Sequence, residues 1–96
     1  MSQALSTEEI QNALKELSGW RFEDNYIKKT FMFTNFKEAM CFMVRVGMDA
    51  ETQDHHPEWF NVYNRVEISL RTHDAGDKVT AKDIKLAKTI ESFSWV

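Results

Sequence analysis

Hydrophobic and polar residues alternate along the chain with two periods, one typical of helices and one typical of strands. The segment Ser6-Thr7-Glu8-Glu9 has the form of a capping box at the start of a helix. Behind it, Ile10, Leu14 and Leu17 fall on one stripe at helical spacing. Gly19 is a natural residue after the end of a helix. The pattern therefore predicts a first helix that runs up to Gly19.

Four shorter segments have the composition or the alternation of strands, and they come in two pairs. They span residues 20–23, 26–33, 58–63 and 66–70, with turn residues at Asp24-Asn25 and near Asn64. Ile27, Phe31 and Phe33 share one side of the second strand, and Phe60 and Val62 share one side of the third. In the fourth strand, Val66, Ile68 and Leu70 alternate strictly with polar residues. We expect two hairpins.

A longer helix is predicted between the two pairs, from an Asn35 cap to about Thr52. Its first apolar stripe, which we expect to face the sheet, contains Phe36, Met40, Met43 and Gly47. A second apolar set lies on a different flank and contains Cys41, Val44 and Met48. A helix that is apolar around most of its circumference favours burial on two sides. We therefore expect another subunit on this flank; the alternative is a few scattered apolar residues at the surface.

A third helix is predicted near the end of the chain. Thr80 and Asp83 form a second capping box, and Ile84, Ala87 and Ile90 follow as one buried stripe. The order of elements is then α-β-β-α-β-β-α. Pairs of strands separated by single helices indicate an α+β fold, a four-stranded antiparallel sheet with helices on one face. We expect a single domain over residues 1–96.

Composition and charge narrow the class of protein further. The chain has 96 residues, of which 43% are hydrophobic and 12% aromatic, as in a folded domain with a modest core. Its net charge of −3 argues against a general nucleic-acid binder. No apolar run approaches the length of a membrane span, and no signal-peptide pattern is present. Its single cysteine, Cys41, suits a reducing compartment, so a cytoplasmic protein is expected.

All three histidines lie in one stretch of the chain, at positions 55, 56 and 73, near the acidic residues Glu51 and Asp54. His73 continues the polar side of the last strand, together with Ser69 and Arg71. If the last two strands pair, His73 returns to the region of His55 and His56. Imidazoles exchange protons near neutral pH, and a neighbouring carboxylate can fix their tautomer. The cluster is thus a candidate acid–base site.

The pattern leaves other interpretations of this cluster open. The histidines can be ordinary surface or capping residues. Three histidines can also bind zinc, although neither a helical H-x-x-x-H spacing nor a cysteine pair supports such a site. Trp59 is more simply a packing residue than a ligand platform. Residue pattern alone does not decide between these readings.

The run Asp54-His55-His56-Pro57-Glu58-Trp59-Phe60-Asn61-Val62-Tyr63-Asn64, followed by Thr72-His73-Asp74, resembles the signature of the pterin-4a-carbinolamine dehydratase family. The likeness extends from Phe36 to the segment Asp83-Ile84-Lys85-Leu86-Ala87, and more loosely to the N-terminus. The run is more similar to the animal-type branch than to divergent bacterial members.

The resemblance implies dehydration of 4a-hydroxytetrahydrobiopterin to quinonoid dihydrobiopterin, a step in tetrahydrobiopterin recycling, with neither a metal nor an organic cofactor. It implies His55 and His56 as acid–base residues and His73 as the third pocket histidine. Glu51 and Asp54 would occupy supporting acidic positions. The residues implied in substrate binding are Trp59, Thr72, Ser69 and Lys82.

The sequence departs from the family pattern in two places. Relatives usually have a Gly-Gly-type turn after the third histidine, whereas here Gly76 is followed by Asp77-Lys78, with one residue more. Lys82 stands where several relatives carry arginine. Lysine keeps the charge but lacks the planar fork of a guanidinium.

The resemblance also implies a function of a different class. Animal members act as dimerisation cofactors for a hepatocyte homeodomain transcription factor, through the long second helix, which would add a nuclear location. Cys41, Val44 and Met48 would then contact either that partner or the other subunits of a homotetramer. Both roles can coexist, because the helix surface and the histidine cluster are separate.

Overall fold

The structure, a computed structural model, describes residues 3–93; the first two and last three residues of the predicted 1–96 domain lie outside the described part. Every predicted helix and strand is present in the predicted order. The elements are α1 (Thr7–Leu14), β1 (Arg21–Glu23), β2 (Tyr26–Met32), α2 (Phe36–Thr52), β3 (Glu58–Val62), β4 (Arg65–Leu70), a short 3₁₀ helix (His73–Ala75) and α3 (Ala81–Glu91).

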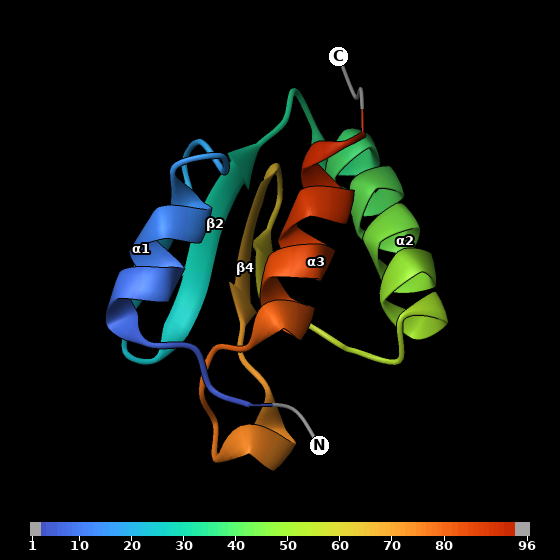
Figure 1. Cartoon of the computed structure of the whole chain (residues 1–96). Coiled ribbons are helices and arrows are strands. Elements are labelled where there is room, and N and C mark those ends of the chain that lie inside the picture. The colour runs from blue at the N-terminus through green and yellow to red at the C-terminus, as the bar shows by residue number, and fades with distance from the viewer. Residues whose placement is uncertain (1–2, 94–96) are drawn as a thin grey trace.

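The four strands form one antiparallel sheet in the order β1-β2-β4-β3. Each predicted hairpin is therefore present, and the two hairpins join through β2 and β4. In that pairing Ile27 lies opposite Leu70, and Phe31 lies opposite Val66, so the apolar sides of both strands coincide. Figure 1 shows α1, α3 and α2 side by side across one face of the sheet. The α+β prediction is confirmed.

The core lies between this face of the sheet and the three helices. Phe42 of α2 is at its centre, with its ring centroid 4.7 Å from that of Phe31 and 4.9 Å from that of Phe33. The predicted stripe of α3, formed by Ile84, Ala87 and Ile90, is buried. Truncating a buried phenylalanine to alanine typically costs about 3–5 kcal/mol, so Phe42 is a main determinant of stability.

The predicted inward face of α2 is wrong. The residues that α2 buries are Ala39, Phe42, Val46 and Ala50, whereas Phe36 and Met40 of the predicted stripe are 44% and 41% exposed. The buried Ala39, Phe42 and Val46 each lie one residue nearer the N-terminus than the predicted Met40, Met43 and Gly47. Three of the four buried residues are small, which lets the helix approach the sheet closely, and the pattern reading favoured the bulkier residues instead.

The first helix is shorter than predicted. Regular α-helix ends at Leu14, and the chain continues through tighter turns in which the amides of Lys15, Glu16 and Leu17 bond to the carbonyl three residues back. Leu17 is nevertheless buried, as its stripe predicted. Gly19, at φ +88°, therefore follows this tight turn and not the α-helix itself.

The outer surfaces of the fold also carry apolar side chains. Phe60 and Val62 lie on the same side of β3, as predicted, and they are exposed on the sheet face that the helices leave open. None of the helices within residues 3–93 combines the length and the hydropathy of a membrane-spanning segment.

Candidate active site

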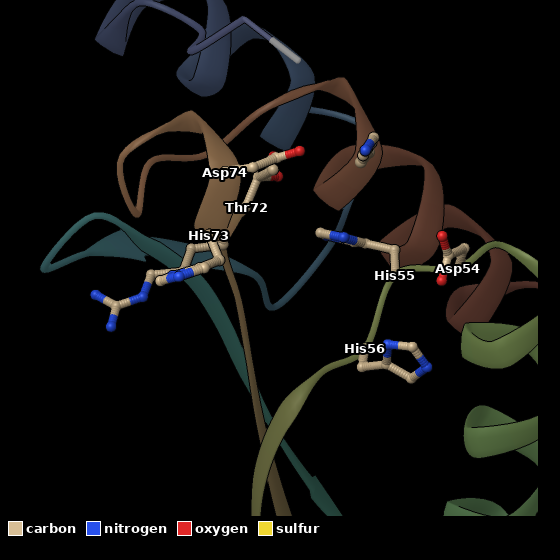
Figure 2. A pocket seen from close by; sticks show the side chains of 8 residues that line it. Asp54, His55, His56, Thr72, His73 and Asp74 are labelled. Carbon is tan, nitrogen blue, oxygen red and sulfur yellow. The ribbon is translucent and has the colours of Figure 1, made fainter. Parts of the chain in front are cut away.

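A pocket of about 350 Å³ opens at one end of the sheet, where three segments meet. The segments are the connection from α2 to β3, the chain that follows β4, and the first turn of α3. In Figure 2, Asp54, His55 and His56 stand on one side of the pocket and Thr72, His73 and Asp74 on the other. The lining residues are Asp54, His55, His56, Arg71, Thr72, His73, Asp74 and Lys82.

The end of α2 determines where His55 enters the pocket. The His55 amide donates to the carbonyl of Ala50, and the Asp54 amide donates to that of Glu51, both at 3.0 Å. These two bonds form a Schellman motif, in which the residue just past the cap adopts the left-handed conformation. That residue is Asp54, at φ +51°. The helix cap thus fixes the backbone of the first site histidine.

His55 is bound to a buried carboxylate. It is 8% exposed, and its Nε2 lies 2.5 Å from Oδ1 of the fully buried Asp83. The other Asp83 oxygen accepts from the Thr80 amide at 2.8 Å and from the Thr72 hydroxyl at 2.9 Å. With Asp83 as a carboxylate, Nε2 of His55 carries the proton and Nδ1 keeps its lone pair. Asp83 therefore sets the tautomer of His55 while it caps α3.

Each of the other two histidines has a carboxylate of its own. His56 Nε2 lies 2.7 Å from Glu51 Oε1, and His73 Nδ1 lies 2.9 Å from Asp77 Oδ1. Both pairs are exposed, so water weakens them more than the buried pair. The hydrogen bond from His73 holds the pKa of Asp77 below its usual value of 3.8. In all three histidines one ring nitrogen is engaged and the other is left for a ligand.

A cation stands beside His73 at the pocket wall. Nε of Arg71 lies 3.5 Å from Glu58 Oε2 and 3.9 Å from Asp77 Oδ1, and its guanidinium stacks 4.2 Å from the ring centroid of Tyr26. The Tyr26 hydroxyl donates to Glu58 at 2.9 Å. Partial burial raises the pKa of Tyr26 above its ordinary value of 10.0, and this hydrogen bond raises it further, so the hydroxyl stays protonated as a donor.

The structure brings most of the predicted site residues together, but not all. The three histidines, Asp54, Thr72 and Lys82 share the pocket, whereas Glu51 reaches it only through His56. Trp59 lies instead in a hollow beside α2, and Ser69 lies on the open sheet face opposite Lys28 and Glu58. Neither lines the histidine pocket: Trp59 stands on the face of β3 that the helices cover, and Ser69 stands on the opposite, open face.

Four residues of the site were not predicted as such: Arg71, Asp74, Asp77 and Asp83. Asp83 was identified only as a capping residue, and its approach to His55 depends on how α3 packs. His73 does not simply continue the last strand, because β4 ends at Leu70 and His73 begins the 3₁₀ helix. That helix, together with Gly76 at φ +78°, turns the chain back so that Asp77 meets His73.

This arrangement suits proton transfer better than metal binding. Each histidine is paired with a different carboxylate, and no three metal-ligating side chains converge among residues 3–93. Carboxylate-bound imidazoles that face one pocket from two sides can give a proton to one atom of a flat ligand and remove a proton from another.

Known proteins similar to this chain share both its sequence and its fold. The family model described as Pterin 4 alpha carbinolamine dehydratase matches residues 3–93. The chain is 53% identical to "Putative pterin-4-alpha-carbinolamine dehydratase" of Opitutus terrae, over 100% of this chain and 99% of that protein. It is 54% identical to a protein of the same name from Christiangramia forsetii, over 95% and 93%.

One solved structure has closely the same fold. It is the crystal structure of a transcriptional coactivator/pterin dehydratase from Brucella melitensis, with a TM-score of 0.89 and 41% identity over 94% of this chain and 97% of that one. These relatives are bacterial, so they give no support to the animal-type affiliation that the histidine run suggested.

Proposed function

Because the chain belongs to the pterin-4a-carbinolamine dehydratase family, we propose that it dehydrates 4a-hydroxytetrahydrobiopterin, or a close pterin analogue, by histidine acid–base catalysis. One observation carries the proposal: three carboxylate-paired histidines from two separate segments line one pocket. In a cell that hydroxylates aromatic amino acids, this reaction would return the pterin cofactor toward its reduced form.

The reaction requires two proton transfers and no change of redox state. The C4a–O bond breaks as an acid protonates the departing hydroxyl, which leaves as water. A base removes the N5 proton, and the electrons of the N–H bond form the C4a=N5 double bond of the quinonoid dihydropterin. Proton uptake and release balance, so imidazoles alone can complete the cycle.

We assign the two proton transfers to His55 and His56, with His73 as the third pocket histidine. His55 has Nε2 committed to Asp83, and its remaining nitrogen, Nδ1, is the one available to substrate. His56 likewise has Nε2 committed to Glu51. Thr72 and Lys82 also line the pocket and are the proposed polar contacts of the pterin, whereas Trp59 and Ser69 are not retained in that role.

Single replacement of His55 and His56 by alanine tests the assignment. Stopped-flow measurement of the dehydration of synthetic carbinolamine should show a rate about 10²–10⁴-fold lower for each variant, since each removes one acid–base group. Gln53→Ala is a matched control, because Gln53 lies in the same connection but bonds Thr89 outside the pocket. Full activity in both histidine variants would refute the mechanism.

An exposed apolar surface favours a second role for α2, in assembly. Met40, Val44 and Met48 are 41%, 52% and 66% exposed, and together with Met43, Gly47 and Trp59 they line a shallow hollow. Exposed apolar groups that gather in this way usually mark an interface. We propose that this surface, with the exposed Cys41 beside it, joins copies of the chain in a homotetramer.

A charged substitution on this surface tests the assembly role. Val44→Glu should dissociate the oligomer in sedimentation velocity, whereas Lys37→Glu, on a polar position of the same helix, should leave it intact. A wild-type chain that sediments as a monomer would exclude the homotetramer. The same surface would then be left for a different protein, as in the coactivator reading of the family.

A further inference from the structure

The chain between β4 and α3 forms a closed loop that carries His73 and Asp77. The Thr72 amide donates to the Lys78 carbonyl at 2.8 Å, and the Lys78 amide donates back to Thr72 at 3.3 Å. Between these ends the 3₁₀ helix and the left-handed Gly76 reverse the chain. Because both ends of the loop are tied, the positions of His73 and Asp77 are set by its backbone.

The orientation of the His73 ring depends on a hydrogen bond and not on packing. The side chain is 96% exposed, so neighbouring atoms restrict its rotamers little. The bond from Nδ1 to Asp77 Oδ1, at 2.9 Å, is what selects one ring orientation and one tautomer. With the proton on Nδ1, Nε2 is the nitrogen left to meet a ligand.

Residues on the strands of the sheet fix the position of Asp77. Nε of Arg71 lies 3.9 Å from the same Asp77 oxygen, and Arg71 is in turn fixed by Glu58 and by stacking on Tyr26. Other charged groups share the pocket with His73: Asp74 in the same loop, Asp54 after α2 and Lys82 in α3. A chain of contacts therefore runs from β2 and β3 through Arg71 to Asp77 and ends on the imidazole.

Asp77 has a backbone conformation that is unfavourable for any residue with a side chain. Its φ is +60°, in the left-handed region that glycine adopts freely and that other residues adopt at about 1–2 kcal/mol. Asp24 pays a similar cost at φ +55° in the β1–β2 turn, and it does not line the histidine pocket. The two aspartates differ in that only Asp77 of the pair holds a histidine.

We infer that Asp77, anchored by Arg71, is a positioning residue that holds His73 as the Nδ1–H tautomer with Nε2 presented to the substrate. The expected effect of Asp77 on the rate rests on the proposed dehydratase function. The hydrogen bond between Asp77 and His73 does not depend on that function. A role in the reaction is thereby assigned to a loop residue that touches neither His55 nor His56.

The experiment compares Asp77→Gly with Asp24→Gly in the full chain. Both changes relieve a left-handed aspartate, which in Asp77→Gly offsets the lost contacts to His73 and Arg71, so both variants should remain folded in chemical denaturation. In ¹⁵N NMR of labelled histidine, Asp77→Gly should shift His73 away from the Nδ1–H tautomer, and Asp24→Gly should leave it unchanged. The dehydration rate should fall about 10- to 100-fold in Asp77→Gly alone, as expected for a misplaced group.

Two results would overturn the inference: an unchanged His73 tautomer in Asp77→Gly, or equal dehydration rates in the two glycine variants. Asp77→Asn guards against a loop that changes shape with glycine, because asparagine tolerates the left-handed conformation and lacks the charge. Its side-chain oxygen can still accept from Nδ1 of His73, so it should keep more of the Nδ1–H tautomer and of the wild-type rate than the glycine variant does. If the wild-type chain shows no dehydration at all, the proposed function fails, while the NMR comparison still decides the positioning of His73.

Discussion

Replacing Asp83 by asparagine changes one atom at the centre of the site and tests how a buried carboxylate controls His55. The oxygen that binds the Thr80 amide and the Thr72 hydroxyl can remain as the amide oxygen of asparagine. The new NH₂ group then faces Nε2 of His55, where a donor would oppose a donor. His55 must either lose this bond or move its proton to Nδ1.

The expected size of each effect follows from that geometry. One hydrogen bond to a charged group is lost in a buried place, which costs about 1.5–3 kcal/mol. For a chain of this length, such a loss lowers Tm by roughly 6–24 °C, at 4–8 °C for each kcal/mol. If His55 changes its tautomer, Nδ1 no longer offers a lone pair to the substrate, and the rate should fall by about 10²–10⁴-fold.

Stability and rate are measured separately, by denaturant titration at fixed protein concentration and by stopped-flow dehydration. Thr80→Ala is the matched control, because it removes the cap of α3 and costs about 1 kcal/mol without touching His55. The reasoning is refuted if the Asp83→Asn variant keeps the wild-type rate. It is also refuted if the control loses as much rate as the asparagine variant, since folding would then explain both.

Three further outcomes are expected. Asp54→Gly should raise the free energy of unfolding by about 0.5–1 kcal/mol in denaturant titration, because Asp54 sits at φ +51° in the helix cap. A loss of dehydration rate beside that gain would show that its carboxylate serves the site. The wild type should be more stable than Asp77→Asn above pH 4, and this difference should disappear as the pH falls through the lowered pKa of Asp77. Denaturation from pH 2 to 7 measures it, and a difference that persists at pH 2 would show that the charge of Asp77 is not its source. Phe42→Ala should cost about 3–5 kcal/mol, and a loss below 1 kcal/mol in thermal or chemical unfolding would show that the aromatic cluster is not central.

Much of the candidate site was visible in the order of residues. Spacing and the neighbouring acidic residues made His55, His56 and His73 a candidate site, and the resemblance to the pterin-4a-carbinolamine dehydratase family implied their role. The pairing of β3 with β4 makes their meeting possible. Capping boxes at Ser6 and Thr80 were predicted because such motifs depend only on residues three apart.

The buried face of α2 and the position of Trp59 depend on how separate segments pack together, and the residue pattern does not give that packing. The face of α2 was misjudged because apolar residues occupy most of its circumference, and only packing against the sheet selects Ala39, Phe42, Val46 and Ala50. The family resemblance implied Trp59 in substrate binding, yet Trp59 lies beside α2, because the side of β3 on which it stands faces the helices.

Local order alone determined the number of elements, their sequence, their caps and the identity of the three histidines, since each of these follows from periodicity or from neighbours along the chain. Tertiary structure decided which carboxylate serves which histidine. Asp83 reaches His55 from the start of another helix, and Asp77 reaches His73 because a left-handed glycine reverses the loop. The contact between His55 and Asp83 spans 28 positions and is set by how α3 packs. The contact between His73 and Asp77 is local, but it depends on a left-handed loop conformation that no period along the chain encodes.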